Sequence, residues 1–143
     1  MKKILLCVLV LSIICFLPIV SFAQKGDKVI AYYFHTTFRC PSCHKIEQYT
    51  EEAIKNNFSK EIESGELEYK VINIEEKGNE HFVQDYKLYT KSVVLSLVKD
   101  GKEAKFKNLE QVWQLLRSKD KFHQYIKSQT QEFLDALRED DRS

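Results

Sequence analysis

Two cysteines one helical turn apart, in the tetrapeptide Cys40-Pro41-Ser42-Cys43, are the residues of this chain best suited to chemistry. Thiols at this spacing can close a small disulfide ring, in which one sulfur attacks a disulfide of a partner and the other resolves the mixed disulfide. A structural disulfide is the alternative, but stabilisation by a cross-link grows with the length of the loop that it closes, so a bridge between near neighbours contributes little. The motif therefore predicts a redox-active disulfide.

The residues around the pair favour a reactive thiolate at Cys40. Pro41 suits the first turn of a helix that starts at Cys40, and a helix N-terminus stabilises negative charge through its dipole and its free N–H groups. Positive charge on Arg39 and His44 would lower the pKa of the Cys40 thiol further. We therefore expect Cys40 to attack and Cys43, one turn deeper and less exposed, to resolve. The residues expected to tune the site are Arg39, Pro41, Ser42 and His44.

The N-terminal residues indicate export. A positively charged start is followed by an apolar run over residues 4–20, and Ser21 and Ala23 match the small-residue rule for signal cleavage. We expect residues 1–23 to be a signal peptide, which would place the mature protein in the periplasm or in another extracytoplasmic space. An uncleaved membrane anchor is the alternative, since the run is near the shortest length that spans a bilayer. The segment also contains the other two cysteines, Cys7 and Cys15.

The remaining chain, residues 24–143, is long enough for one hydrophobic core and too short for two. Without Lys2 and Lys3 the formal charge changes from +1 to −1. This near-neutral net charge does not indicate binding to nucleic acid or to an anionic membrane. The isolated glycines form no nucleotide-binding pattern, so no flavin or nicotinamide cofactor is expected. We expect a monomer that touches a membrane only through the N-terminal segment, if that segment is retained.

Hydrophobic spacing predicts the elements that hold the dithiol. An aromatic-rich strand over 28–35, apolar on both faces, leads to the motif. A helix from Cys40 carries apolar residues at helical spacing as far as Phe58. Further on, the patterns predict strands over 67–74, 93–98 and 103–106, the last two joined by a turn at Asp100-Gly101, and helices over 79–89, 109–116 and 120–137. The helix over 79–89 is expected to turn Phe82, Val83, Tyr86 and Tyr89 inward.

This order of elements, with the dithiol at the first strand-to-helix junction, resembles the thioredoxin superfamily. The resemblance lies in the aromatic strand that runs into Cys40-Pro41-Ser42-Cys43, in the strand over 69–74, and in the strand over 94–98 that ends in Lys99-Asp100-Gly101-Lys102. Within the superfamily, the chain resembles the exported thioredoxin-like proteins of the ArsF family. The resemblance implies a thioredoxin-like α/β fold, with a central mixed sheet flanked by helices. The two helices predicted after the last strand exceed what a minimal fold of this kind needs and give an extended C-terminal helical region. It also implies thiol–disulfide exchange with a protein or a small-thiol partner.

Two departures from the superfamily pattern concern the surroundings of the dithiol. The proline that usually faces the dithiol is absent from the stretch 90–93, so we expect a trans peptide bond before Val93. The buried carboxylate that helps thioredoxins to deprotonate the resolving thiol falls, counting back from Cys40, on Phe34. Glu47 on the following helix is expected to be solvated and not to replace it. These departures predict slower or more specialised exchange than that of a general thioredoxin.

The motif also matches the attachment site of c-type haem, because His44 follows the second cysteine and attachment takes place in oxidising compartments. Met1 is the only methionine, so the common second axial ligand would be lost with the signal peptide. The motif follows a strand inside an α/β pattern, which also weighs against haem. The histidines left to serve as the second ligand are His35, His81 and His123.

Soft-metal or metalloid binding through Cys40 and Cys43 is another alternative, with His35 or His44 as a third ligand. The missing proline favours it, since in the superfamily that proline keeps metals off the sulfurs. Against it, tetrahedral zinc needs a fourth ligand that the sequence does not supply, and a histidine in a strand is more often packed in a core. No residue is therefore assigned to a metal.

The predicted C-terminal helices raise a further alternative, in which the protein is a non-catalytic interaction module. Both carry an apolar stripe, which we expect to cover the sheet. The alternative is that Trp113 lies at a docking surface for a partner. The two stripes are Leu109, Val112, Trp113 and Leu116, and Phe122, Tyr125, Ile126, Phe133 and Leu137.

Overall fold

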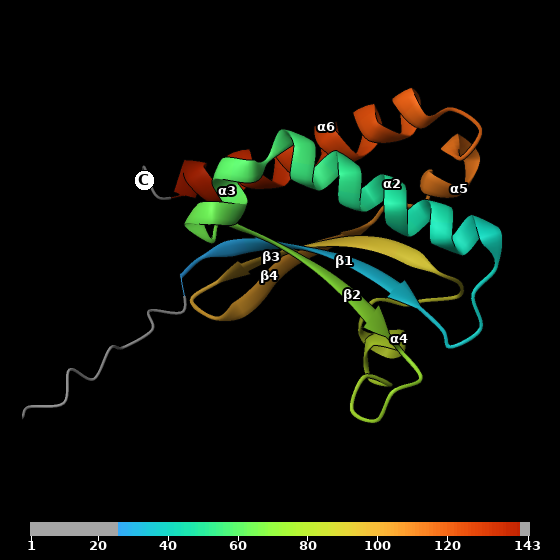
Figure 1. Cartoon of the computed structure of the whole chain (residues 1–143). Coiled ribbons are helices and arrows are strands. Elements are labelled where there is room, and N and C mark those ends of the chain that lie inside the picture. Colours follow the sequence, from blue (N-terminus) through green and yellow to red (C-terminus); the bar gives the residue numbers. More distant parts are fainter. Residues whose placement is uncertain (1–25, 141–143) are drawn as a thin grey trace, which may run out of the picture.

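A four-stranded mixed sheet forms the centre of the protein, in a computed structural model that describes residues 26–140 (Figure 1). The expected signal peptide, residues 1–23, lies outside the described residues. Along the sheet the strands follow the order β2-β1-β3-β4, with β2 parallel to β1, β3 antiparallel to β1, and β4 antiparallel to β3. This topology is thioredoxin-like and confirms the expected fold. The strands are β1 (Lys28–His35), β2 (Leu67–Asn73), β3 (Ser92–Lys99) and β4 (Lys102–Asn108).

β1 is the central strand that leads to the dithiol. Its six inner residues, 29–34, are all buried, which confirms the prediction of a strand covered on both faces. The pairing places Tyr33 opposite Val93, and Phe34 opposite Ser92. The end of β1 and the start of β3 therefore lie at the same edge of the sheet, and the loops beyond them are neighbours.

Two long helices, α2 (Pro41–Asn57) and α6 (Lys119–Asp140), lie side by side over one face of the sheet (Figure 1). Each places apolar residues at helical spacing against the strands, and burial of such a side chain stabilises the fold by about 1.5–3 kcal/mol. A short helix that the sequence did not predict, α3 (Ser59–Ser64), follows α2 and ends at Gly65, whose φ of 82° forms a left-handed cap. The buried helical residues of this core include Ile46, Ala53, Ile54, Phe122, Ile126 and Leu134.

The segment after β2 differs from its prediction. The helix expected over 79–89 is a single turn, α4 (Phe82–Asp85), flanked by turns. Tyr86 is buried as predicted, but Val83 is 37% exposed and Tyr89 is 95% exposed. The inward placement of Tyr89 was wrong because Lys87, with a φ of 51°, ends the helical periodicity. The inward placement of Val83 was wrong because its neighbour Phe82 takes the position on this single turn that faces the sheet. Around α4, Phe82, Tyr86 and Leu88 instead cover the second face of the sheet, against Ile30, Tyr32 and Phe34.

The C-terminal region packs onto the sheet as expected. The helix predicted over 109–116 is shorter, α5 (Val112–Leu115), while α6 is longer than predicted. Leu109 and Val112 are buried, and Trp113 is partly buried against the main core. Both apolar stripes therefore cover the sheet. Within residues 26–140, no helix has the length and apolar character needed to cross a membrane.

Candidate active site

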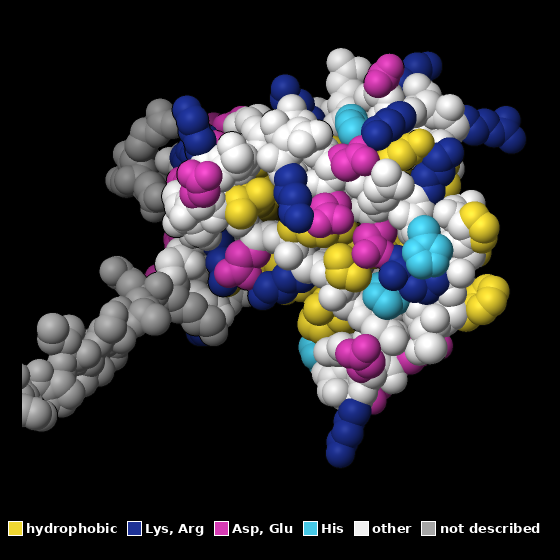
Figure 2. All heavy atoms as spheres, in the orientation of Figure 1, with side chains coloured by type: hydrophobic (Ala, Val, Ile, Leu, Met, Phe, Trp, Pro, Cys, Tyr) yellow, Lys and Arg dark blue, Asp and Glu magenta, His cyan; other side chains and the backbone are white. Residues whose placement is uncertain are grey.

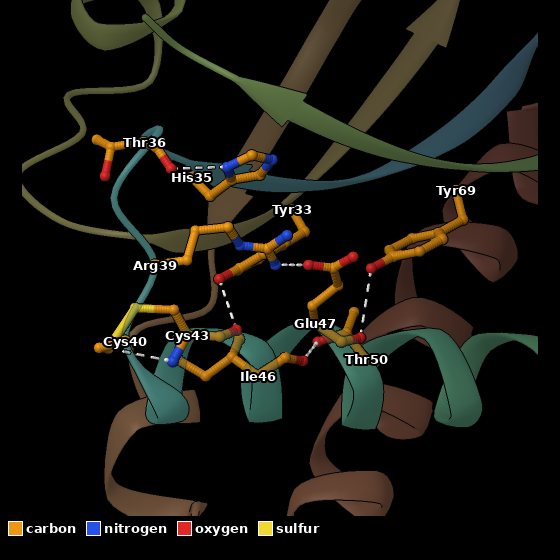
Figure 3. A network of polar contacts seen from close by, with 10 residues as sticks. All are labelled: Tyr33, His35, Thr36, Arg39, Cys40, Cys43, Ile46, Glu47, Thr50 and Tyr69. Carbon is orange, nitrogen blue, oxygen red and sulfur yellow. Dashed lines mark hydrogen bonds and ion pairs between the residues drawn. A yellow bond between two sulfur atoms is a disulfide. The ribbon is translucent and has the colours of Figure 1, made fainter.

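The two cysteines of the motif are joined by a disulfide at the N-terminus of α2 (Figure 3). Their Cα atoms are 5.1 Å apart, within the usual range for a disulfide. Cys40 is the N-cap residue, Pro41 is the first residue of the helix, and the Cys40 sulfur accepts a hydrogen bond of 3.3 Å from the backbone N–H of Cys43. Because the N–H groups and the dipole of a helix N-terminus favour negative charge, the Cys40 sulfur lies where a thiolate is stabilised.

The two sulfur-bearing residues differ in exposure. Cys40 is partly exposed, whereas Cys43 is only 1% exposed. An attacking thiol has to be reached by its partner, while a resolving thiol needs to reach only the sulfur beside it. Pro41, Ser42 and His44 are exposed around the bridge. The arrangement matches the needs of an attacking thiol at Cys40 and a resolving thiol at Cys43.

Arg39, directly before Cys40, forms an ion pair with Glu47 on α2. Only 21% of the Arg39 side chain and 24% of the Glu47 side chain are exposed. Figure 3 shows the guanidinium turned toward Glu47 and Tyr33, and its central carbon lies 5.8 Å from the centre of the Tyr33 ring. The expectation of a solvated Glu47 was wrong, because Arg39 holds this carboxylate at the inner side of α2. Glu47 in turn balances much of the positive charge next to Cys40.

Tyr33 supports the first turn of α2 from the sheet. Its hydroxyl donates a hydrogen bond of 2.7 Å to the carbonyl oxygen of Cys43, and both residues are buried. Burial raises the pKa of Tyr33, although the nearby Arg39 opposes the shift, so the hydroxyl stays protonated and can donate at neutral pH. One turn later, the Tyr69 hydroxyl donates to the backbone oxygen of Glu47 at 3.4 Å, and burial also raises the pKa of Tyr69. Two strands thus hold the inner side of α2.

Sequence reasoning assigned no role to these tyrosines and placed the missing carboxylate at Phe34. In the structure, Phe34 lies on the opposite face of the sheet, packed against Phe82 and Tyr86. A shift of one residue in a strand moves a side chain to the other face, so the residue beneath the dithiol is Tyr33. Because β1 is apolar on both faces, no alternation in its sequence distinguishes the face of Tyr33 from that of Phe34.

The loop that enters β3, at the same end of the sheet as the end of β1, is held without a proline. Residues 26–140 contain no cis peptide bond, so the bond before Val93 is trans as expected. The indole N–H of Trp113 donates to the Lys91 carbonyl oxygen at 3.0 Å, and the Ser92 hydroxyl donates to the Thr90 carbonyl oxygen at 2.9 Å. Trp113 therefore fixes the loop as well as packing against the core.

The histidines considered as ligands lie apart from one another. His35 contacts the Thr36 carbonyl oxygen through Nδ1 at 2.9 Å, His81 pairs with Asp85 at 2.7 Å, and His123 lies 3.4 Å from a Glu52 oxygen. In the described part of the chain, no group of three or more His, Cys, Asp or Glu side chains is placed to hold a metal ion. The structure therefore brings the two cysteines together without a third ligand.

Comparison with known protein families gives no match for this chain, and comparison with curated proteins gives none. Solved thioredoxins are similar to it in structure. A thioredoxin of Fasciola hepatica is 20% identical, with a TM-score of 0.37 over 64% of this chain and 81% of the other. An Entamoeba histolytica thioredoxin mutant is 22% identical, with a TM-score of 0.40 over 73% and 84%. Oxidised thioredoxin O2 of Arabidopsis thaliana is 17% identical, with a TM-score of 0.41 over 71% and 80%.

Proposed function

We propose that this protein is an extracytoplasmic thiol–disulfide oxidoreductase in which Cys40 and Cys43 alternate between dithiol and disulfide. The observation that carries the proposal is the disulfide itself, between a partly exposed N-cap cysteine and a buried cysteine in the first turn of α2. A bridge that spans three residues stabilises a fold little. Its position at a helix N-terminus, in contrast, is one that activates a thiolate.

The exchange step follows from this geometry. In the reducing direction, the Cys40 thiolate attacks one sulfur of a partner disulfide, the partner's S–S bond breaks, and its other sulfur leaves as a thiolate that takes up a proton. The Cys43 thiolate then attacks the Cys40 sulfur, which breaks the mixed disulfide and releases the partner's second sulfur. Two electrons pass to the partner, and the Cys40–Cys43 disulfide is the product. With a partner dithiol as the electron donor, the same steps run in reverse.

The surrounding residues keep the reacting atoms in place. Tyr33 holds the carbonyl group of Cys43, so the first turn of α2 stays anchored while the sulfur changes its bond. Trp113 holds the loop at Lys91, so the loop that enters β3 beside the end of β1 is already ordered before a partner arrives. Preformed surfaces lower the ordering cost of each encounter.

The location and the family are parts of the same proposal that depend on sequence. The apolar N-terminal segment with Ser21 and Ala23 supports cleavage and export, and the likeness of the strands and of the Cys-Pro-Ser-Cys motif supports kinship with the exported ArsF-type proteins. N-terminal sequencing of protein recovered from fractionated cells tests export. A mature chain that starts at Gln24 in an extracytoplasmic fraction is the expected result, and an intact chain in the cytosol would contradict it.

The decisive test of the exchange function is the reduction potential of the Cys40/Cys43 couple, measured by glutathione titration with thiol trapping. A reversible two-electron couple is expected. A value below about −220 mV would indicate a reductant that needs an electron donor, and a value near about −120 mV an oxidant of folding proteins. No reversible couple, or a metal or haem bound in the same sample, would overturn the proposal.

A further inference from the structure

The strand β2 forms an open edge of the sheet. It pairs with β1 from Leu67 to Asn73 in one unbroken register, and it is the last strand on its side of the order β2-β1-β3-β4. In Figure 1 β2 lies at the front of the molecule, and Figure 2 shows hydrophobic side chains and charged side chains of both signs over this part of the surface. A regular edge strand is a template on which another chain can pair.

Two hydrogen bonds show which backbone groups of β2 face outward. The Val29 N–H donates to the Glu66 carbonyl oxygen at 2.8 Å, and the Ile74 N–H donates to the His35 carbonyl oxygen at 2.9 Å. The backbone groups of successive residues point to opposite sides of a strand. The even-numbered residues of β2 therefore face β1, and the odd-numbered residues face the open edge.

Three odd-numbered residues have N–H and C=O groups that bond to no other segment within residues 26–140, namely Leu67, Tyr69 and Val71. The next one, Asn73, differs because its carbonyl oxygen accepts a hydrogen bond of 3.3 Å from the Glu76 N–H. The Val71 side chain is also 40% exposed. The open edge therefore extends from Leu67 to Val71 and combines available backbone groups with apolar surface.

The other edge of the sheet, β4, is protected from such pairing. Its pairing with β3 contains a register shift, and it carries three exposed lysines, Lys102, Lys105 and Lys107. Irregular backbone and lysine side chains both hinder the addition of a further strand. β2 has the single lysine Lys70, which pairs with Glu68 on the same face of the strand at 2.9 Å. The charges of β2 therefore do not repel every added strand.

A second copy of β2 fits this edge in one register. Two antiparallel copies related by a two-fold axis form a closed pair. Three registers pair at least two of the outward residues with one another. The register centred on Glu68 places this residue opposite its own copy, and the register centred on Lys70 does the same with the lysine. The register centred on Tyr69 pairs all three outward residues and places each Glu68 opposite Lys70 of the other copy. Opposite charges directly across two strands stabilise the pairing, whereas like charges destabilise it.

We propose that two copies of this chain dimerise through the open edge of β2, antiparallel and centred on Tyr69, with Glu68 of each copy opposite Lys70 of the other. Leu67 then lies opposite Val71 of the other copy, so the exposed Val71 side chain is covered. Because the two β2 strands run in opposite directions, the two dithiols lie at opposite ends of one continuous sheet and each stays open to a partner. Such a dimer takes the place of the monomer expected from the sequence, and it does not depend on the exchange function.

Sedimentation equilibrium of the oxidised mature protein, from about 1 µM to about 1 mM, tests the dimer. The wild type should dimerise reversibly in this range, because the pairing of two single strands is a small interface. Glu68→Lys and Lys70→Glu each place like charges opposite one another twice, so each should weaken dimerisation about tenfold or more. An equimolar mixture of the two variants should form a heterodimer with close to wild-type affinity, because every lysine again lies opposite a glutamate.

Lys102→Glu is the matched control, because it reverses a charge on the other edge strand and should leave the dimer unchanged. Circular dichroism shows that each variant is folded, which is expected because the side chains of Glu68 and Lys70 are 34% and 43% exposed. A wild type that stays monomeric at about 1 mM, a dimer that both single variants retain, or a mixture without heterodimer would overturn the inference. A dimer that a reductant separates would also overturn it, since the link would then be a disulfide. Each of these results leaves the exchange function standing, which the reduction potential tests.

Discussion

The hydroxyl of Tyr33 in β1 donates a hydrogen bond of 2.7 Å to the carbonyl oxygen of Cys43 in the first turn of α2. This bond joins the central strand to Cys43, the residue that we propose to resolve the mixed disulfide. Both groups are buried, so water cannot replace either partner. β1 therefore fixes the distance between the sheet and the first turn of α2. β1 itself, Lys28–His35, contains no carboxylate that could take this position.

Replacement of Tyr33 by phenylalanine should destabilise the fold by about 0.5–1.5 kcal/mol, the usual net value of one internal hydrogen bond. Denaturant unfolding of the oxidised protein measures this loss. Tyr69→Phe is the matched control, because its bond to the Glu47 backbone oxygen is longer, at 3.4 Å, and should cost less. Equal losses in the two variants would show that the Cys43 carbonyl bond has no special role.

The ion pair between Arg39 and Glu47 should set how strongly Arg39 affects the Cys40 thiol. In Glu47→Gln, the guanidinium loses its counter-charge, so the pKa of Cys40 in the reduced protein should fall. In Arg39→Met, Glu47 keeps an unbalanced negative charge, so the same pKa should rise. Thiolate absorbance followed as a function of pH measures both shifts. The double variant should return close to the wild type, because the two opposite shifts cancel when both charges are removed. A double variant that keeps the shift of either single variant would show that the charge balance of this pair does not set the pKa.

Trapping of the mixed disulfide tests the roles of the two thiols. Cys43→Ser lacks the resolving thiol and should accumulate disulfide-linked partner. Cys40→Ser retains only a sulfur that is 1% exposed in the structure and should trap several-fold less. Non-reducing electrophoresis with mass spectrometry of the trapped species gives the measurement. Equal trapping by both variants, or more by Cys40→Ser, would reverse the assignment.

Much of the fold was predictable because its signals are local. The aromatic and β-branched residues of β1, and the helical spacing from Ile46 to Phe58, each identify an element without knowledge of its neighbours. The single turn of α4 was not predictable, since it depends on the left-handed backbone of Lys87, a residue that seldom adopts it.

The polar part of the site was predictable only in part, because it depends on contacts between separate elements. The motif predicted that Cys40 and Cys43 lie together as a bonded pair, and the structure joins them. The motif did not predict the partner of Arg39, which lies on the helix eight residues further along the chain. An isolated glutamate on a helix is usually solvated, and only the fold shows that Glu47 is not. The face of Tyr33 and its hydrogen bond both depend on the position of α2 above the sheet, which an all-apolar strand does not reveal.

Acid should weaken the attachment of the edge strand β2. Hydrogen bonds from Lys28 and Lys70 lower the pKa of Glu68 below its ordinary value, and Lys28 links β2 to β1. A carboxyl whose folded pKa is lowered stabilises the fold above its ordinary pKa of about 4.3, and this contribution is lost as the pH falls through the folded value. Glu68→Gln should therefore cost up to about 1 kcal/mol at pH 7 and nothing at pH 2, since these side chains are partly exposed. An equal cost in unfolding experiments at both pH values would exclude this origin.

Trp113 should affect both the stability of the fold and the rate of exchange, because its indole holds the loop that enters β3. Trp113→Phe keeps most of the packing but removes the hydrogen bond to the Lys91 carbonyl oxygen, so unfolding followed by circular dichroism should show a loss of about 0.5–1.5 kcal/mol. Because the loss frees the loop before Val93, the KM for a peptide disulfide should rise several-fold while kcat changes little. Ser92→Ala, which removes the bond to the Thr90 carbonyl oxygen within the same loop, should act in the same direction. A stability loss with an unchanged KM would mean that the indole serves the core alone.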